Sequence, residues 1–167
     1  FLFPDMWVII NIIQSILIVA YTLLCTILAL IPALIGFPKA SYWIARKIWG
    51  PFLLLLVGGK LIIKGKENID PSKTYIYAAN HMSNFDIPIL FSITSVSLHF
   101  IAKKELKKIP LFGWCITAMG MIYVDRKNKM KAVESMKAAG ILIKSGKNVI
   151  AFPEGKRSRS GKIEMFR

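Results

Sequence analysis

The first apolar stretch of the chain is long enough to form a membrane helix. Positions 6 to 38 contain no charged residue, and a helix needs about 20 apolar residues to cross the hydrocarbon core of a bilayer. Its less apolar positions recur mostly at helical spacing, which predicts one face turned toward another helix. These positions are Asn11, Gln14, Ser15, Thr22, Thr26, Ala29 and Ala33. The pattern leaves open whether the segment spans the bilayer or lies in one leaflet.

A second apolar segment, from position 39 to 57, is the expected partner of this helix. It carries aromatic residues and cations of the kind that anchor at the headgroup boundary, among them Trp43, Arg46 and Trp49. Pro32, Gly36 and Pro38 interrupt the apolar pattern before it. Proline and glycine are typical of turns, so we expect residues 1–58 to form a helical membrane anchor.

After Gly58 the pattern changes to short apolar runs that alternate with helical patterns. The runs rich in β-branched or aromatic residues predict strands at Leu61–Lys64, Tyr75–Ala79, His99–Ala102, Met121–Val124 and Asn148–Phe152. Alternation of strands and helices is typical of α/β folds with a largely parallel sheet flanked by helices. We therefore expect residues 59–167 to form one α/β domain behind the anchor.

The clearest helical pattern covers Lys129–Lys144 and ends before Gly146. Its apolar face is predicted from the 3.6-residue period. That face consists of Val133, Met136, Ala139, Gly140 and Ile143.

Charge separates the two parts of the chain. The formal net charge is +14, and the mean hydropathy of +0.51 is high for a soluble protein. Residues 1–58 hold only three of the 23 Lys and Arg residues and one of the nine acids. The remaining, strongly basic part favours anionic partners such as phospholipid headgroups or a phosphorylated substrate. We expect no nucleic-acid partner, because the cations are not interleaved with aromatics in a recognisable module.

The two cysteines and two histidines exclude several kinds of site. Cys25 and Cys115 are too far apart in the sequence to indicate a disulfide framework or a zinc site. His99 lies inside an apolar run, which favours a packed side chain. We therefore expect no bound metal, since the neighbours of the histidines do not supply a ligand set.

The most informative chemistry is the pair His81 and Asp86, five positions apart and directly after a predicted strand. A histidine can accept a proton near neutral pH, and a carboxylate within reach fixes its tautomer and stabilises the imidazolium. The sequence contains no GxSxG motif, and neither cysteine lies in a nucleophile motif. The attacking hydroxyl is therefore expected to belong to a substrate.

The same residues also fit a structural role. Ser83 to Asp86 resembles a capping box, in which both side chains only satisfy the first amides of a helix. Pro88 argues against this reading, because it would then occupy the fifth helical position, where proline is costly. A helix that begins nearer Asp86 places Pro88 in the first turn, where proline is tolerated.

Two further predicted strands also end in charged residues. The run 120–126 ends in Arg126, and the loop after Phe152 carries cations suited to a phosphate, namely Lys156, Arg157 and Arg159. Each has a plainer interpretation. Arg126 would be an ordinary strand-end residue, the cations would touch anionic lipid, and Glu154 would be only their counter-ion.

Three motifs together resemble the glycerolipid acyltransferase family with its HxxxxD motif, most closely the bacterial 1-acyl-sn-glycerol-3-phosphate acyltransferases. They are NHxSxxD at 80–86, IYVDR at 122–126 and FPEGxRS at 152–158. The resemblance implies that His81 is the general base and Asp86 its orienting partner. It also implies a set of residues that bind the phosphorylated glycerol substrate: Arg126, Glu154, Gly155, Arg157 and Ser158. Lys156 departs from the Thr often found in the third block.

The implied reaction moves a fatty acyl group from a thioester to the free hydroxyl of 1-acyl-sn-glycerol-3-phosphate and gives phosphatidic acid. The co-substrate would be acyl-CoA or an acyl carrier protein thioester, with no other cofactor, and the partners would be membrane lipid and lysophosphatidic acid. The enzyme would be membrane-associated, with its catalytic domain on the cytoplasmic side. The family's fourth block is not present before Arg167, so we expect the chain to be truncated at its C-terminus.

Two alternatives remain open. Within the same chemistry, the acceptor would be glycerol-3-phosphate or another lysolipid. In a different class, the chain would be a non-catalytic basic membrane-binding module in which His81 and Asp86 serve only as capping residues.

Overall fold

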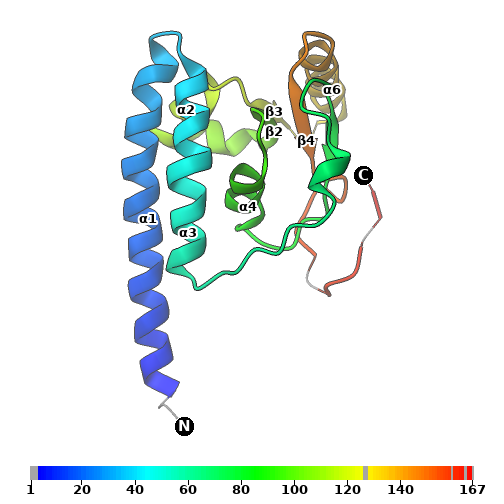
Figure 1. Ribbon diagram of the computed structural model, residues 1–167. Helices are drawn as coiled ribbons and strands as arrows, with labels where there is room; N and C mark the ends of the chain where they lie inside the picture. The colour runs from blue at the N-terminus through cyan, green and yellow to red at the C-terminus, as the bar shows by residue number, and fades with distance from the viewer. Residues whose placement is uncertain (1–3, 126–127, 159, 164, 167) are drawn as a thin grey trace.

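The computed structural model describes residues 4–125, 128–158, 160–163 and 165–166. It consists of a long helical pair beside an α/β part (Figure 1). The helices are α1 (Pro4–Leu34), α2 (Pro38–Ile44), a π-helical turn (Ala45–Trp49), α3 (Gly50–Leu56), α4 (Asp86–Ile93), α5 (Phe112–Ala118) and α6 (Lys129–Lys144). The strands are β1 (Ile76–Ala78), β2 (Leu98–Lys103), β3 (Ile122–Val124) and β4 (Asn148–Ala151), and short 3₁₀ turns cover Lys66–Asn68 and Lys104–Lys108.

The helical pair is formed by α1 and the column α2 to α3, which runs back alongside it (Figure 1). Polar side chains join the two: the Gln14 amide donates to the Leu56 carbonyl at 3.2 Å, and the Trp49 indole donates to the Thr22 hydroxyl at 3.1 Å. These contacts confirm that the polar stripe of the first helix faces a second helix. In the described part of the chain, one helix, Met6–Leu34, is long and apolar enough to cross a membrane.

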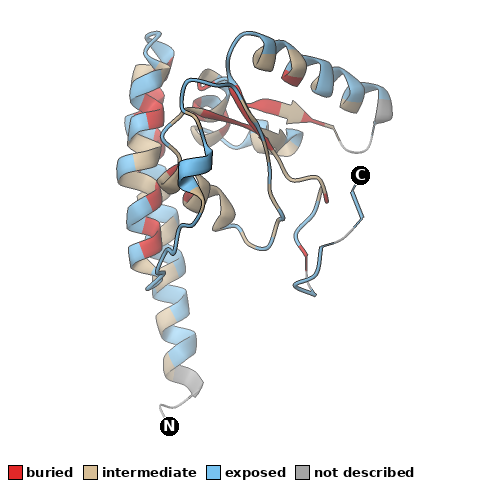
Figure 2. Cartoon of the chain, turned by 45° about the vertical axis from the view of Figure 1, so that its right-hand side comes forward, coloured by how far each residue is buried: buried red, intermediate tan, exposed pale blue. Residues whose placement is uncertain are grey.

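The sheet has the strand order β1-β4-β2-β3, and every neighbouring pair is parallel. This confirms the predicted largely parallel sheet flanked by helices. On one face, Leu98, Phe100 and Ile150 pack in a core with buried residues of α1, α4 and α5. On the other face, Ile122 and Val149 pack against Ala139 of α6. Figure 2 shows these buried positions on the strands and along α1.

The predicted strand Leu61–Lys64 is wrong. The segment belongs to no helix or strand and lies in the extended connection between α3 and β1. Ile62 is 77% exposed, so its β-branched side chain does not pack against a sheet. Strand propensity mainly reflects such packing, and this run does not pair with any described strand.

The predicted limits of the last long helix are confirmed, because α6 covers Lys129–Lys144. Its predicted inward face is confirmed in part: Ala139 is buried and Ile143 packs beside it together with Leu142, whereas Val133 and Met136 are exposed. The Ser135 hydroxyl donates to the Tyr123 carbonyl at 2.7 Å and joins the first half of α6 to β3. A hydrophobic pattern does not predict this polar contact.

Candidate active site

The ends of β1 and β4 bring two of the predicted motifs together. Because the two strands are parallel neighbours, with Ala78 opposite Ala151, their carboxyl ends lie at the same edge of the sheet. His81 follows β1, and the loop 152–158 follows β4. Ligands of open parallel sheets usually bind at this edge. Arg126, predicted to join them from the end of β3, lies outside the described residues.

The imidazole of His81 and the carboxylate of Asp86 form a direct contact, with 2.6 Å between Nδ1 and Oδ2. The same Oδ2 accepts the backbone N–H groups of Met82 at 2.8 Å and Ser83 at 2.9 Å. Both side chains are partly buried, 19% and 16% exposed. Three donors thus converge on one carboxylate oxygen, which fixes the position of Asp86 and, through it, of the ring.

The capping-box interpretation accounts for only part of this geometry: Asp86 Oδ2 accepts from the Ser83 N–H, as in a capping box, but the same oxygen also contacts the His81 imidazole. Helix α4 begins at Asp86 with Pro88 in its first turn, and its N-cap is Phe85. The amides bound by Asp86 precede the helix, and the Ser83 hydroxyl accepts from Phe85 N at 3.1 Å. The expectation that the helix starts near Asp86 is confirmed, and the carboxylate is directed at the loop and the imidazole.

Phe152, the first residue of the third motif, fixes the plane of the His81 ring. The two rings stack with 4.2 Å between centroids and an interplanar angle of 24°. An ionised carboxylate only accepts hydrogen bonds, so Nδ1 carries the proton toward Asp86 and Nε2 presents a lone pair. The ring is therefore held in the tautomer that accepts a proton at Nε2.

The loop 154–158 is fastened to the backbone of His81 on both sides. The His81 N–H donates to Glu154 Oε1 at 3.4 Å, and the Ser158 N–H donates to the His81 carbonyl at 2.7 Å. Gly155, between them, has φ of +67°, in the left-handed region that favours glycine. The loop therefore crosses His81 as a bridge with both ends pinned.

Glu154 and Ser158 form the two buried ends of this bridge. Glu154 is 1% exposed and Ser158 is 8% exposed. The Ser158 hydroxyl donates to the Lys162 carbonyl at 2.8 Å. Of the five residues predicted to bind substrate, these two have side chains occupied with holding the loop, whereas Arg157 is exposed.

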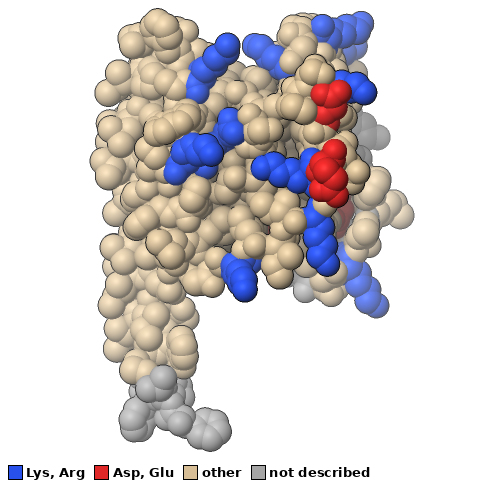
Figure 3. Space-filling model, in the orientation of Figure 1, with Lys and Arg blue, Asp and Glu red and all other residues tan. Residues whose placement is uncertain are grey.

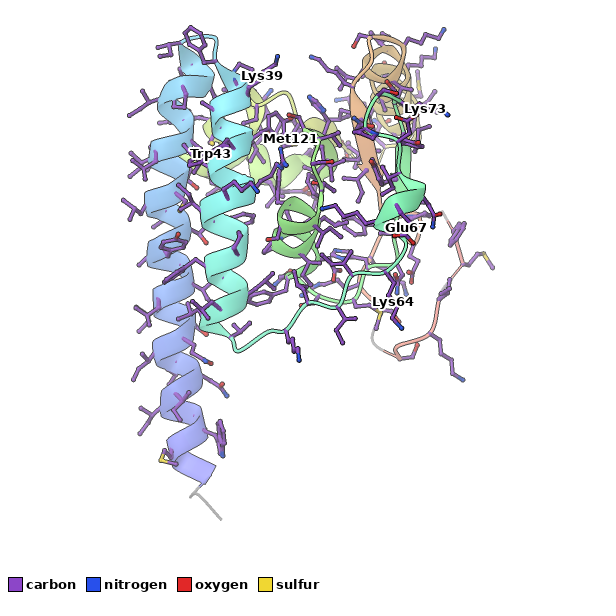
Figure 4. The ribbon with its side chains drawn as sticks, in the orientation of Figure 1. Lys39, Trp43, Lys64, Glu67, Lys73 and Met121 are labelled. Carbon is purple, nitrogen blue, oxygen red and sulfur yellow. The ribbon has the colours of Figure 1, made fainter. Side chains whose placement is uncertain are left out.

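A cavity of about 1170 Å³ opens beside His81, between the helical pair and the α/β part. One part of its wall is polar, with His81, Lys103, Lys156, Arg157 and Ser158. The rest is largely apolar and comes from several elements, including Ala29 of α1, Trp49 of the π-helical turn, Phe91 of α4, Cys115 of α5, and Met121. Figure 4 places Met121 between the helical pair and the sheet.

Two residues at this site were not predicted from the sequence to act there. Lys103 ends β2 and lines the cavity, 3.8 Å from Glu105 through its ammonium group. Its position at a strand end was a usable signal, because the carboxyl ends of parallel strands meet at one edge. Phe152 gave no comparable signal, since stacking on a distant histidine depends on the pairing of β1 with β4.

Charge is distributed unevenly around the cavity. Lys and Arg gather over the α/β part, while much of the helical pair presents an uncharged surface (Figure 3). Inside the cavity wall, burial raises the pKa of the Cys115 thiol to about 11. This thiol is therefore neutral near pH 7 and poorly suited to act as a nucleophile.

The arrangement can remove a proton from a hydroxyl that enters the cavity near Nε2. The cations suit an anionic group on the same molecule, and the apolar wall suits a hydrocarbon chain. The site thus fits an amphiphile with an anionic head.

Comparisons with known proteins point to one family. Residues 60–167 match the family model described as Acyltransferase. The chain is 31% identical to the 1-acyl-sn-glycerol-3-phosphate acyltransferase of Saccharomyces cerevisiae, over 87% of this chain and 46% of that protein. The Borreliella burgdorferi protein of the same name is 32% identical, over 68% of this chain and 46% of the relative. The chain thus spans under half the length of these curated relatives.

A solved structure agrees with the sequence comparisons. The crystal structure of the 1-acyl-sn-glycerophosphate (LPA) acyltransferase PlsC from Thermotoga maritima matches with a TM-score of 0.74 and 26% identity. The match covers 95% of this chain and 67% of that chain. It includes both the helical pair and the parallel sheet.

Proposed function

The chain belongs to the acyltransferase family, and from this premise we propose that it transfers a fatty acyl group from a thioester to 1-acyl-sn-glycerol-3-phosphate, giving phosphatidic acid. The observation that carries the proposal is the held pair His81 and Asp86 at a cavity with cations on one part of its wall and apolar residues on the rest. The names of the relatives support this choice of acceptor.

In the proposed reaction, Nε2 of His81 takes the proton of the acceptor's free hydroxyl as its oxygen attacks the thioester carbonyl. Asp86 stabilises the imidazolium that forms. Collapse of the tetrahedral intermediate breaks the carbon–sulfur bond, and the imidazolium returns the proton to the leaving thiolate. An ester and a free thiol result, and no acyl-enzyme forms.

The phosphate of the acceptor would bind to Arg157 and Lys103, which line the same cavity as His81. An Arg guanidinium meets phosphate oxygens with two parallel hydrogen bonds. A phosphate bound there keeps the hydroxyl near Nε2. The attack on the thioester then takes place within one bound complex and does not need a separate bimolecular encounter. Arg126 is a further phosphate ligand in this proposal on the strength of the resemblance, and Glu154, Gly155 and Ser158 set the path of the loop.

The apolar wall would hold a fatty acyl chain, and either acyl-CoA or an acyl carrier protein thioester would deliver it. Membrane attachment through α1 supports this role, because an acyl chain and the product both prefer lipid. Many large side chains of α1 are exposed, such as Ile16 at 61% and Val19 at 59%. In this proposal the basic part lies on the cytoplasmic side, because Lys and Arg close to the end of a membrane helix, here Lys39, Arg46 and Lys47, favour that side.

The direct test supplies the full-length protein with acyl-CoA or acyl carrier protein thioester and lysophosphatidic acid in vesicles, and follows the lipid product by mass spectrometry. We expect phosphatidic acid, and much less product with glycerol-3-phosphate as acceptor. Preferential acylation of glycerol-3-phosphate or another lysolipid would contradict the acceptor. Salt-sensitive vesicle binding without thioester consumption would contradict acyl transfer and favour the non-catalytic module.

A further inference from the structure

Lys156 occupies the middle of the bridge that crosses His81. The contacts of the His81 N–H with Glu154 and of the His81 carbonyl with Ser158 pin the loop on either side of it. Both pinning residues are buried, 1% and 8% exposed, whereas Lys156 is exposed and lines the cavity. The backbone that carries this ammonium group is therefore fixed relative to the base.

The bridge places Lys156 next to Arg157, and both line the same cavity as His81 and Lys103. An anionic headgroup held beside His81 therefore meets cations from two different strand ends. The two neighbouring cations on the bridge differ in what they recognise. A guanidinium donates two parallel hydrogen bonds to two oxygens of one phosphate. An ammonium group is a compact point charge that can bind a further oxygen.

We propose that Lys156 makes the site selective for acceptors with a phosphomonoester headgroup over lysolipids with a phosphodiester headgroup. A phosphomonoester has three terminal oxygens and a charge of about −1.5 to −2 near pH 7. Arg157 binds two of these oxygens and Lys156 the third. In a phosphodiester that third oxygen is esterified and the second charge is absent, so Lys156 gains little. This selectivity rests on the proposed acyl transfer and refines its acceptor.

The test compares the wild-type full-length protein with Lys156→Gln and Lys156→Arg in uncharged detergent micelles. The two acceptors are lysophosphatidic acid and its methyl phosphodiester, which differ only at the phosphate. Lys73→Gln is the matched control, because it removes the same charge from an exposed lysine that precedes β1 at the amino end of the sheet (Figure 4).

We expect Lys156→Gln to raise KM for the monoester about fivefold, which is the size of effect expected from the loss of one exposed ion pair. KM for the diester changes by less than about twofold, and kcat for both acceptors stays within about twofold. Lys156→Arg restores most of the preference because it keeps the charge, and Lys73→Gln alters neither KM.

Three results overturn the proposal, and they are distinguishable. An equal rise of KM for both acceptors shows general attraction of anions rather than selectivity. A change seen only on anionic vesicles and not in micelles assigns Lys156 to the membrane surface. Turnover of neither acceptor by the wild type overturns acyl transfer itself, and the selectivity with it.

Discussion

Two regions of the same sheet each carry a histidine, and they show how placement decides chemistry. His81 follows β1 at the carboxyl edge, where its Nδ1 meets the carboxylate of Asp86. His99 lies inside β2, is 5% exposed, and its Nδ1 meets the backbone carbonyl of Asn148 at 3.1 Å. Burial lowers the pKa of His99. At the edge of the sheet the imidazole has a carboxylate partner, whereas the interior of the sheet disfavours the charged form of His99.

Aromatic contact does not separate the two histidines. His81 stacks on Phe152, and the ring of His99 lies 5.5 Å from that of Tyr42. The difference lies in the charged partner and in access, since the described residues that line the cavity include His81 and not His99. A histidine is therefore a candidate catalytic base only where it has both a carboxylate partner and access to a cavity. Substitutions at four residues test this comparison.

Replacement of the edge histidine has the largest expected effect. We expect His81→Ala to lower kcat about a thousandfold, because general-base catalysis contributes about that much. The measurement is the initial rate of thiol release with lysophosphatidic acid present, alongside binding of the variant to vesicles as a folding control. A loss of less than about tenfold with intact vesicle binding would remove His81 from the reaction.

Removal of the charge of Asp86, the partner of His81, has the second-largest expected effect. Asp86→Asn keeps an oxygen that can accept from Met82 and Ser83 but no longer stabilises the imidazolium. We expect kcat to fall about a hundredfold while KM for the acceptor changes little. Equal activity of this variant and the wild type would mean that Asp86 is structural, as the capping reading held.

Loss of the stacking partner has a smaller effect. Phe152→Leu keeps an apolar side chain but removes the ring that fixes the imidazole plane, and aromatic pairs of this kind contribute roughly 1 kcal/mol. We expect kcat to fall about fivefold with KM nearly constant, and Phe152→Tyr to retain most of the activity. If Phe152→Leu raised KM instead, Phe152 would contact the substrate rather than position His81.

The interior histidine is expected to affect stability and its pH dependence rather than turnover. Because the folded state disfavours charged His99, the unfolded state binds more protons as the pH falls past the ordinary value of 6.5. The free energy of unfolding therefore falls as the pH is lowered. It should fall less in His99→Gln than in the wild type. Denaturant midpoints at about pH 7.5 and about pH 5 give the comparison. A steeper acid loss in the variant, or a hundredfold fall of kcat, would contradict this contrast between the two histidines.

The sequence predicted much of the fold because local patterns carried it. The parallel sheet, the limits of α6 and the start of the helix near Asp86 are confirmed, and so is the family inferred from three motifs. Each depends on short-range periodicity or on residues whose chemistry is tied to neighbours in the chain. The pair His81 and Asp86 was visible for the same reason, since a helix start brings the two side chains together.

The parts that the sequence did not predict depend on contacts between distant segments. Leu61–Lys64 has strand-like residues but no described strand beside it, and α6 meets β3 through the hydroxyl of Ser135. The bridge over His81 and the stacking of Phe152 require β1 to lie next to β4. Hydrophobic period alone does not encode strand order, so these features emerge only from the three-dimensional structure.

The central claim is that His81 activates a hydroxyl of the substrate and not one of the protein. A single turnover of the full-length protein with acyl thioester and lysophosphatidic acid, sampled by intact-protein mass spectrometry, tests it most directly. We expect phosphatidic acid to form in step with released thiol while the protein's mass stays unchanged. An acylated protein that forms and decays at the rate of turnover, whether on Cys115, Ser158 or another residue, would contradict it.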